Sequence, residues 1–369
     1  MALRMMTAKK PRLSYYCHSL GTPDHERCNA LAEDYDVIAY DWARDNGYIW
    51  KIPGARNYTY RKIDASSGLK KLLGAGKLLV GTISDRATAS IFYGYHNIFF
   101  FFSATIAKLL MRTSITMLDS KFDDYDRTII PDLPKKVLLT PYDANLVASE
   151  RAAAYAKYLS SAPKFTYYCA IDTYRVSEIS REHYRAIAFE DRQFVMVARF
   201  VPKKNHKLAL KAYERYLTAS KAPHKLTLYG YGPLEEELKE MIATSELLSR
   251  HVTVSGFVPS AEIPRVMGQS LALILPSTEE QFGIVTTEAL SASVPVIISK
   301  QCGSADLVVS GENGYVMNTY DESELANYML LVSEDEAHWN RLSSRAPEKA
   351  RNADVQVFRA LVNNIVKYG

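Results

Sequence analysis

Residues 271–290 have the sequence LALILPSTEEQFGIVTTEAL, which decides the fold. The apolar run Leu271–Leu275 predicts a buried strand, and the Pro, Ser and Gly residues after it predict a tight turn that leads into a helix. Ligands of open α/β sheets bind outside the carboxyl ends of such strands. This edge carries Glu280 in the turn, Glu288 in the helix and free helix N–H groups between them. Carboxylates accept hydrogen bonds from hydroxyls and helix N-termini bind anions, so the stretch predicts a site for a phosphorylated, polyhydroxylated ligand.

Short apolar or β-branched runs alternate with amphipathic segments along most of the chain, which favours an α/β fold with parallel sheets wound by helices. The expected strands form two series, so we predict two doubly wound, Rossmann-like domains. The first series is Leu13–Tyr16, Val37–Tyr40, Leu78–Thr82, Ser114–Leu118, Val137–Thr140 and Thr166–Cys169. The second is Phe194–Val197, Leu226–Tyr229, Val252–Ser255, Leu271–Leu275, Val296–Ile298 and Gly314–Met317. Expected helices include Lys207–Leu217, Leu234–Thr244 and Ser323–Val332.

The chain of 369 residues is too long for one ordinary hydrophobic core. We place the linker in the polar, charged stretch Ser177–Glu190, so residues 1–185 form the first domain and residues 186–354 the second. The last segment, Val355–Lys367, is apolar at helical spacing and therefore needs a partner surface.

Composition narrows the class of protein. Apolar residues make up 47% and charged residues 23%, as in globular proteins, and the net charge of +4 does not indicate a nucleic-acid binder. The cysteines lack metal or disulfide spacing, so we expect reduced thiols in a cytoplasmic protein. No apolar run reaches the ~20 residues that span a bilayer, and residues 1–12 lack the apolar core of a signal peptide. The cysteines are Cys17, Cys28, Cys169 and Cys302.

The aromatic stretch Ile91–Phe102 has two interpretations. It reads as a core helix or strand of the first domain. It also reads as an aromatic surface that touches an anionic membrane, since Lys108 and Arg112 follow it. The second interpretation predicts a peripheral protein on the inner face of the cell membrane.

The stretch with Glu280 and Glu288 resembles the Glu-x7-Glu motif of glycosyltransferase family 4 (GT4), whose members are retaining enzymes of the GT-B fold. Residues 197–205, VARFVPKKN, resemble that family's strand-Gly-Arg-x4-Lys-Gly segment, and residues 228–233, LYGYGP, resemble its Gly-x-Gly-Pro turn. The resemblance implies two Rossmann-like domains that face a cleft, with a C-terminal helix, residues 355–369, that crosses back to the first domain. It also implies transfer of a sugar from a UDP- or GDP-linked donor to a hydroxyl of an acceptor. We expect a lipid-linked or growing cell-surface saccharide as acceptor, as in lipopolysaccharide, O-antigen or exopolysaccharide synthesis.

The resemblance also implies roles for residues of the second domain. Glu280 would bind donor-sugar hydroxyls and Glu288 the ribose, while Arg199 and Lys204 would hold the diphosphate. An Arg and a Lys five residues apart at a strand end converge on one diphosphate, and they stabilise negative charge on the leaving group. Neighbouring cations lower carboxylate pKa values, so we expect both glutamates to stay ionised. Lesser donor contacts are expected from Gln281, Phe282, Gly283 and Ile284 by their amides, from Phe257 and Val258 near the nucleobase, and from Gly230.

First-domain candidates match the family less closely. Gly21 and His18 lie where the family has a glycine-rich loop near the donor phosphates. Asp119 follows the strand Ser114–Leu118, where many members carry a histidine that touches the sugar. Three roles remain open for Asp119: it binds a hydroxyl, it orients the acceptor, or it is a polar residue at a strand end with no role in the site.

We expect no cofactor and no metal. Asp124-Tyr125-Asp126 matches an Asp-x-Asp metal motif of a different glycosyltransferase class, but in its charged context it reads better as a solvated loop. Two other functions remain open: a nucleotide-sugar epimerase, which needs no acceptor, and a nucleotide-sugar-binding protein without turnover.

Overall fold

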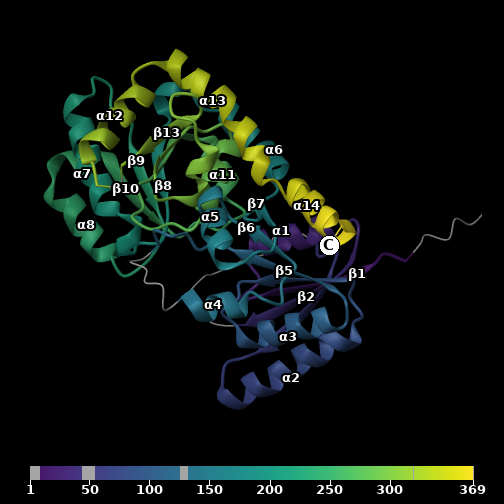
Figure 1. Ribbon diagram of the computed structural model, residues 1–369. Helices are drawn as coiled ribbons and strands as arrows, with labels where there is room; N and C mark the ends of the chain where they lie inside the picture. Colours follow the sequence, from purple (N-terminus) through teal and green to yellow (C-terminus); the bar gives the residue numbers. More distant parts are fainter. Residues whose placement is uncertain (1–8, 44–54, 125–131, 319, 369) are drawn as a thin grey trace, which may run out of the picture.

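The computed structural model describes residues 9–43, 55–124, 132–318 and 320–368, and it shows two α/β domains joined side by side (Figure 1). The first sheet has the strand order β3-β2-β1-β4-β5-β6-β7, and the second has the order β10-β9-β8-β11-β12-β13. Neighbouring strands pair in parallel, and helices cover the sheets, so the predicted pair of Rossmann-like domains is confirmed.

The strands of the first sheet are β1 (Arg12–Cys17), β2 (Asp36–Ala43), β3 (Thr59–Asp64), β4 (Ala89–Tyr93), β5 (Thr113–Leu118), β6 (Ala144–Val147) and β7 (Lys164–Thr166). Those of the second are β8 (Gln193–Val197), β9 (Leu226–Tyr229), β10 (Val252–Gly256), β11 (Ser270–Leu275), β12 (Val296–Ser299) and β13 (Gly314–Met317). All strands predicted for the second domain are therefore confirmed.

The first-domain helices are α1 (Thr22–Leu31), α2 (Gly68–Ser84), α3 (Ile98–Leu109), α4 (Asp132–Leu138) and α5 (Glu150–Leu159). They are followed by α6 (Thr173–Arg185), α7 (His206–Ala219), α8 (Glu235–Thr244), α9 (Glu246–His251), α10 (Ile263–Gly268), α11 (Ile284–Ser291), α12 (Glu322–Ser333), α13 (Glu336–Ala350) and α14 (Val355–Tyr368). Short 3₁₀ turns are η1 (Phe189–Asp191), η2 (Pro202–Lys204), η3 (Gly303–Leu307) and η4 (Arg351–Ala353).

Several predictions for the first domain were wrong. Leu78–Thr82 lies inside helix α2, Val137–Thr140 overlaps the end of α4, and Thr166–Cys169 begins at the last residue of β7. The strands β3 and β6 were not predicted, and β4 overlaps the start of Ile91–Phe102, which was read as a core helix or strand. A short apolar run cannot distinguish a buried strand from a buried turn of helix. In α2 the Ser67 side chain, which accepts a hydrogen bond from the Lys70 amide, starts the helix well before the apolar run.

Most of the stretch Ser177–Glu190, which was predicted to be the linker, forms helix α6. This helix packs on α10 and α11 of the second domain. Val176 and Ser180 form its buried face, while charged residues cover the rest, which explains why the sequence reads as polar. The chain crosses between the domains before this helix: Ile171 pairs with Asp354 in a short parallel bridge.

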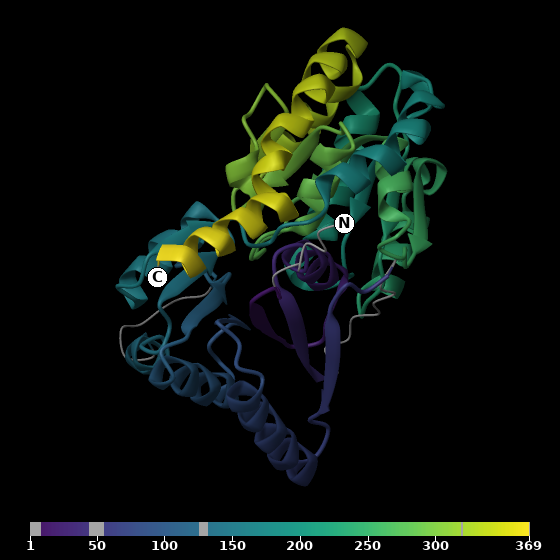
Figure 2. The same cartoon turned by 90° about the vertical axis from the view of Figure 1, so that its right-hand side faces the viewer.

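The C-terminal helix crosses back to the first domain, as predicted. Figure 2 shows α13 on the second domain and α14, in yellow, reaching the first. Helix α14 packs on α1, where Phe358 and Val362 are buried. At the edge of this contact, the Arg359 guanidinium donates to the Asp34 carboxylate at 2.6 and 2.8 Å.

The stretch Ile91–Phe102 is divided between β4 and α3. Ile91, Phe92 and Phe100 are fully buried, whereas Phe102 is exposed. The core interpretation therefore holds for most of the stretch. Among the described residues, no helix has the length and apolar character needed to cross a bilayer.

Candidate active site

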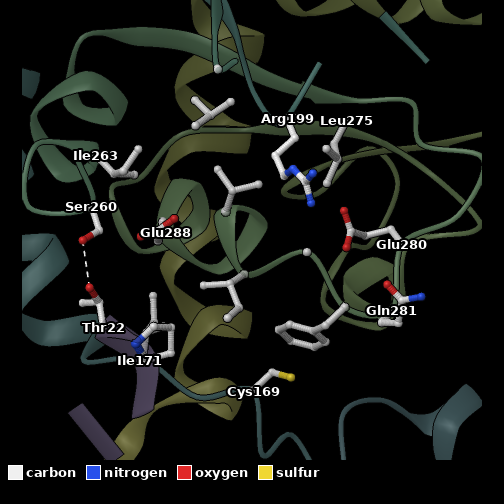
Figure 3. Close-up of a pocket in the computed structure, with 18 of the residues that line it drawn as sticks. Thr22, Cys169, Ile171, Arg199, Ser260, Ile263, Leu275, Glu280, Gln281 and Glu288 are labelled. Carbon is white, nitrogen blue, oxygen red and sulfur yellow. Dashed lines mark hydrogen bonds between the residues drawn. The ribbon is translucent and has the colours of Figure 1, made fainter. Parts of the chain in front are cut away.

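A cavity of about 610 Å³ lies between the two domains, at the carboxyl ends of strands from both sheets (Figure 3). Nearly all of the predicted site residues line it. They are Glu280, Arg199, Lys204, Asp119, Glu288, Gln281, Phe282, Gly283, Ile284, Phe257, Val258, Gly230 and His18. The fold thus brings together residues that lie more than two hundred positions apart.

One side of the cavity carries a cluster of opposite charges. Lys204, at the end of the η2 turn after β8, forms an ion pair with the Glu280 carboxylate, and both side chains are mostly buried. Figure 3 shows Arg199 and Glu280 extending toward one another. The neighbouring Lys203 pairs with Glu279 at 2.9 Å. The cleft therefore holds cations at the end of β8 that an anionic ligand would share with Glu280.

Two backbone conformations shape this cluster. Asn205, which follows Lys204 and precedes α7, has the left-handed φ of 58°. Asn is one of the few non-glycine residues that tolerate this conformation, which explains its presence where the resembled family has Gly. Gly283, before α11, has a φ of 92°, and a Cβ there would stand 3.1 Å from the Leu275 side chain and 3.2 Å from the Glu280 side chain.

Glu288 lies on the other side of the cavity, four residues into α11 (Figure 3). Burial raises the pKa of Glu288 to about 8, and the Glu26 carboxylate raises it further against a lowering effect of Arg175. The expectation that Glu288 stays ionised was wrong, because Arg199 and Lys204 are not the charges that face it. Burial and the Glu26 carboxylate thus favour the protonated form of Glu288 near neutral pH.

Glu26 and Arg175 are cavity-lining residues that the sequence did not single out. The Arg175 guanidinium on α6 donates to the Glu26 carboxylate on α1 at 2.5 and 3.1 Å, and the Asp172 amide donates to the same carboxylate at 2.9 Å. This contact holds α1 against the segment in which the chain crosses between the domains. No local signal marks the pair, because its members lie on helices of different domains.

Asp119 and His18 enter the cavity from the ends of β5 and β1. Burial raises the pKa of Asp119 above its ordinary value. The His18 ring stacks on Phe100 of α3, with ring centroids 4.7 Å apart. Both side chains thus present polar groups to the cleft from the first domain.

Gly21 is not among the residues that line the cavity. It precedes α1 instead, where its amide donates to the Asp24 carboxylate at 3.2 Å. The next residue, Thr22, does line the cavity, and its hydroxyl lies 2.8 Å from that of Ser260 in the second domain (Figure 3). Gly21 thus precedes α1 outside the cavity lining, and a direct contact between the domains lies beside it.

Lys121 is a third residue that the sequence did not single out. It comes from the first domain, its side chain is 1% exposed, and its ammonium group donates to the backbone carbonyl of Glu280 at 2.6 Å. It also pairs with the Asp124 carboxylate at 3.0 Å. A buried ammonium group thus connects the first domain to the turn that carries Glu280.

The far end of the cavity is aromatic. Tyr231 and Phe257 meet edge to face with centroids 5.6 Å apart, and both line the cavity beside Val258. Gly230, with a φ of 153°, approaches the backbone of β8 so closely that a Cβ would clash with the Ala198 carbonyl. Gly230 thus keeps this aromatic wall close to the end of β8.

Within the described ranges, no group of three or more His, Cys, Asp or Glu residues is placed to hold a metal ion. In the Asp-x-Asp motif, Asp124 pairs with Lys121, while Tyr125 and Asp126 lie outside the described residues. All four cysteines are buried free thiols.

Comparison with known proteins agrees with this geometry. Residues 181–349 match the profile of the family "Glycosyl transferases group 1". The amylovoran biosynthesis glycosyltransferase AmsK of Erwinia amylovora is 30% identical over 151 residues, which are 39% of this chain and 37% of that protein. The O-antigen chain mannosyltransferase B of Escherichia coli is 24% identical over 143 residues, again 39% of this chain and 37% of the relative. The chain thus aligns with less than half the length of these curated relatives.

Solved structures agree over nearly the whole chain. Sucrose-phosphate synthase from Thermosynechococcus elongatus superimposes with a TM-score of 0.73 at 15% identity, covering 97% of this chain and 98% of that one. The Anabaena protein HepE, solved in complex with UDP, gives a TM-score of 0.73 at 17% identity, covering 97% and 99%. The molecule therefore has the GT-B architecture, and residues 181–349, most of its second domain, are similar to the glycosyl transferases group 1 family.

Proposed function

We propose that this protein is a retaining glycosyltransferase that moves a sugar from a nucleoside-diphosphate sugar to a hydroxyl of a saccharide acceptor. The observation that supports the proposal best is the charge cluster in the cavity. Arg199 and Lys204 stand at the end of β8, opposite the Glu280 carboxylate, in a cleft between two Rossmann-like domains. Fixed cations suit a diphosphate, and a carboxylate suits sugar hydroxyls.

The donor would lie along the second-domain wall. Its diphosphate takes the place of Glu280 as a partner of Lys204 and binds Arg199, which leaves the Glu280 carboxylate to accept hydrogen bonds from sugar hydroxyls. Amides at the start of α11, near Phe282 to Ile284, add donors to the phosphate oxygens. The ribose hydroxyls reach Glu288, and the base, of UDP or GDP, rests near Phe257 and Val258.

The reaction would then proceed on one face of the sugar. The bond between the anomeric carbon and the diphosphate oxygen breaks while the acceptor hydroxyl forms its bond to that carbon from the same side. The acceptor proton passes to the leaving diphosphate, whose charge Arg199 and Lys204 stabilise. Asp119 and His18, from the first domain, orient the acceptor. No metal or other cofactor is needed, so chelation by EDTA should leave the rate unchanged.

The names of the matched relatives support the choice of acceptor. They include proteins of amylovoran and O-antigen synthesis, so a lipid-linked or growing cell-surface saccharide is the acceptor class that we propose.

Acceptor-dependent donor consumption tests the proposal. UDP- and GDP-sugars are incubated with and without a mixture of lipid-linked saccharides, and the anomeric configuration of the product is read by NMR. Transfer with retained configuration is expected, with a loss of at least about a hundredfold in Arg199→Ala. Conversion of the donor sugar without an acceptor would instead identify an epimerase. Donor binding without turnover, against every acceptor offered, would identify a binding protein.

A further inference from the structure

The turn between β11 and α11 carries two consecutive polar side chains, Glu280 and Gln281, and both line the cavity. The Gln281 side-chain amide donates from Nε2 to the Glu279 carboxylate at 2.8 Å. An ionised carboxylate only accepts hydrogen bonds, so this contact fixes which atom of the amide is the nitrogen. The side-chain carbonyl oxygen of Gln281 therefore faces away from Glu279. Figure 3 shows this oxygen on the side of Glu280.

An ion pair holds the amide in this orientation. The Lys203 ammonium group donates to the same Oε1 atom of Glu279, at 2.9 Å. Burial opposes the charge of Glu279, but hydrogen bonds from Lys203 and Gln281 outweigh it and lower the pKa of Glu279 below its ordinary value. Glu279 is therefore ionised at neutral pH. Because Lys203 and Glu279 are both partly exposed, their pair orients Gln281 more than it stabilises the fold.

The backbone on both sides of Gln281 is fixed as well. The Glu280 carbonyl accepts a hydrogen bond from the Gly303 amide at 3.1 Å, and the Phe282 carbonyl accepts one from the Ser304 amide at 2.8 Å. A Cβ at Gly303 would stand 2.0 Å from the backbone oxygen of Gln281, so the turn lies directly against η3. Movement of the turn would break these contacts. The Gln281 side chain thus extends from a fixed place on the cavity wall.

Two consecutive lysines pair with two consecutive glutamates at this wall. Lys203 pairs with Glu279, and Lys204 pairs with Glu280. In the proposed function the diphosphate binds Lys204, which leaves Glu280 for the sugar hydroxyls. Lys203 and Glu279 are not among the residues that line the cavity, so the diphosphate does not compete for their pair. The orientation of Gln281 is therefore set before the donor binds and is kept afterwards.

The side-chain carbonyl oxygen of Gln281 is available to a ligand. Within residues 9–43, 55–124, 132–318 and 320–368, no group donates a hydrogen bond to it. An amide carbonyl oxygen has two lone pairs and can accept from a hydroxyl. The wall therefore offers two acceptors from neighbouring residues, the Glu280 carboxylate and the Gln281 carbonyl.

We propose that Gln281 is a specificity-determining residue for the donor sugar. Its side-chain carbonyl accepts a hydrogen bond from the hydroxyl next to the one that Glu280 binds, so the site selects sugars with two neighbouring free hydroxyls. A sugar that lacks one of these hydroxyls, or carries a substituent on it, leaves an acceptor unpaired and binds more weakly. Gln281 has this role only if the proposed function holds, since the role requires a nucleoside-diphosphate sugar in the cavity.

Calorimetric titration of free nucleotides and sugar nucleotides tests this role. The ligands are UDP, GDP, UDP-glucose, UDP-galactose and GDP-mannose. In Gln281→Ala, the affinity for the sugar nucleotide that binds should fall about threefold to tenfold more than the affinity for its free nucleotide. The matched control is Gln356→Ala, at an exposed glutamine of α14, which should bind both ligands as the native protein does.

Monodeoxy analogues of that sugar nucleotide, one for each hydroxyl, identify the group that Gln281 binds. In the native protein, loss of this hydroxyl should weaken binding by the same factor as Gln281→Ala does. The variant should bind the same analogue as well as it binds the parent sugar nucleotide, because the hydrogen bond is already absent.

Glu279 acts through Gln281, as a positioning residue. Glu279→Gln should weaken binding of the sugar nucleotide in the native background and have no further effect in the Gln281→Ala background, which a merely structural role would not produce. Glu237→Gln is the control, because Glu237 forms an exposed ion pair with Lys207 in the same domain.

Equal losses of affinity for the sugar nucleotide and the free nucleotide in Gln281→Ala would show that Gln281 only supports the turn, and would overturn the inference. Native affinity of this variant for the sugar nucleotide would overturn it as well. No binding of any of these ligands to the native protein would contradict the proposed function itself, and the role of Gln281 would fail with it.

Discussion

Glu288 carries an unusual protonation state for a residue expected to bind ribose. Burial raises its pKa to about 8, which favours the protonated carboxyl near neutral pH. Hydroxyls that donate to a carboxylate favour its charged form and lower its pKa. We therefore expect nucleotide binding at pH 7 to release a proton from Glu288, and the affinity to rise from pH 6 to pH 8.

Calorimetry in buffers of different ionisation enthalpy measures this proton release. The variant Glu288→Gln serves as the control, since the nucleotide phosphates titrate identically with both proteins. The release of close to one proton should vanish in Glu288→Gln. An equal release by both proteins would mean that Glu288 does not change protonation on binding.

The protonation of Glu288 also sets a stability trend. Between pH 4.5, the ordinary pKa of this carboxyl, and about pH 8, Glu288 keeps a proton in the folded state that it has lost in the unfolded state. The free energy of unfolding should therefore fall as pH rises through that window. Urea titrations at pH 5 and pH 8 should show a smaller fall for Glu288→Gln. A fall of the same size in the variant would contradict the pKa assignment.

Lys121 acts on the site through the Glu280 backbone, as a positioning residue. Replacing Lys121 with Met leaves Asp124 buried without this partner, which should destabilise the protein by about 3–5 kcal/mol. A second change, Asp124→Leu, removes the carboxylate that has lost its Lys121 ammonium partner and should restore most of the thermal stability. If Lys121 positions Glu280, the double variant should still transfer sugar slowly, with a lower kcat and little change in the KM for the donor. Full recovery of kcat would show that Lys121 is structural alone.

At the scale of elements, the orientation of α2 rests on its glycines. Gly74→Ala places a Cβ against Ile63 and should destabilise the first domain by about 1–3 kcal/mol. Gly76 lies in the same helix with no atom within 4 Å of a Cβ, so Gly76→Ala should stabilise by about 0.5–1 kcal/mol through helix propensity. Urea unfolding of the two variants measures the difference. Equal effects would show that α2 does not need its close approach to the sheet.

The elements of the second domain could be predicted because its strands read as continuous apolar runs that end in turn residues, as in LALILP before Ser277. In the first domain, the run Leu78–Thr82 has the composition of such a strand, yet it continues a helix that starts at Gly68. The sequence identified Arg199, Lys204 and Glu280 because each lies in a turn after a strand, in a segment that resembles a known motif. Lys121, Glu26 and Arg175 were not, because their importance arises from contacts between domains that sequence spacing does not record.

At the scale of the whole molecule, the crossing helix α14 joins the two domains. Phe358 is fully buried where α14 meets the first-domain core, so Phe358→Ala should cost about 3–5 kcal/mol and lower the melting temperature. The adjacent Val357 is 40% exposed, and Val357→Ala should change stability by less than about 0.5 kcal/mol. Calorimetric melting of both variants compares them directly. Similar melting temperatures would indicate that α14 contributes little to the union of the domains.

The central claim is that the interdomain cavity binds a nucleoside diphosphate through Arg199 and Glu288. The most direct measurement is calorimetric titration of the purified protein with UDP, GDP and ADP. Arg199→Ala and Glu288→Ala are titrated in parallel, with Arg250→Ala as a charge-matched control on exposed α9. We predict that one nucleotide binds, that each cavity variant weakens it at least about tenfold, and that the control binds as the native protein does. Unchanged binding in both cavity variants, or no binding of any nucleotide, would contradict the account.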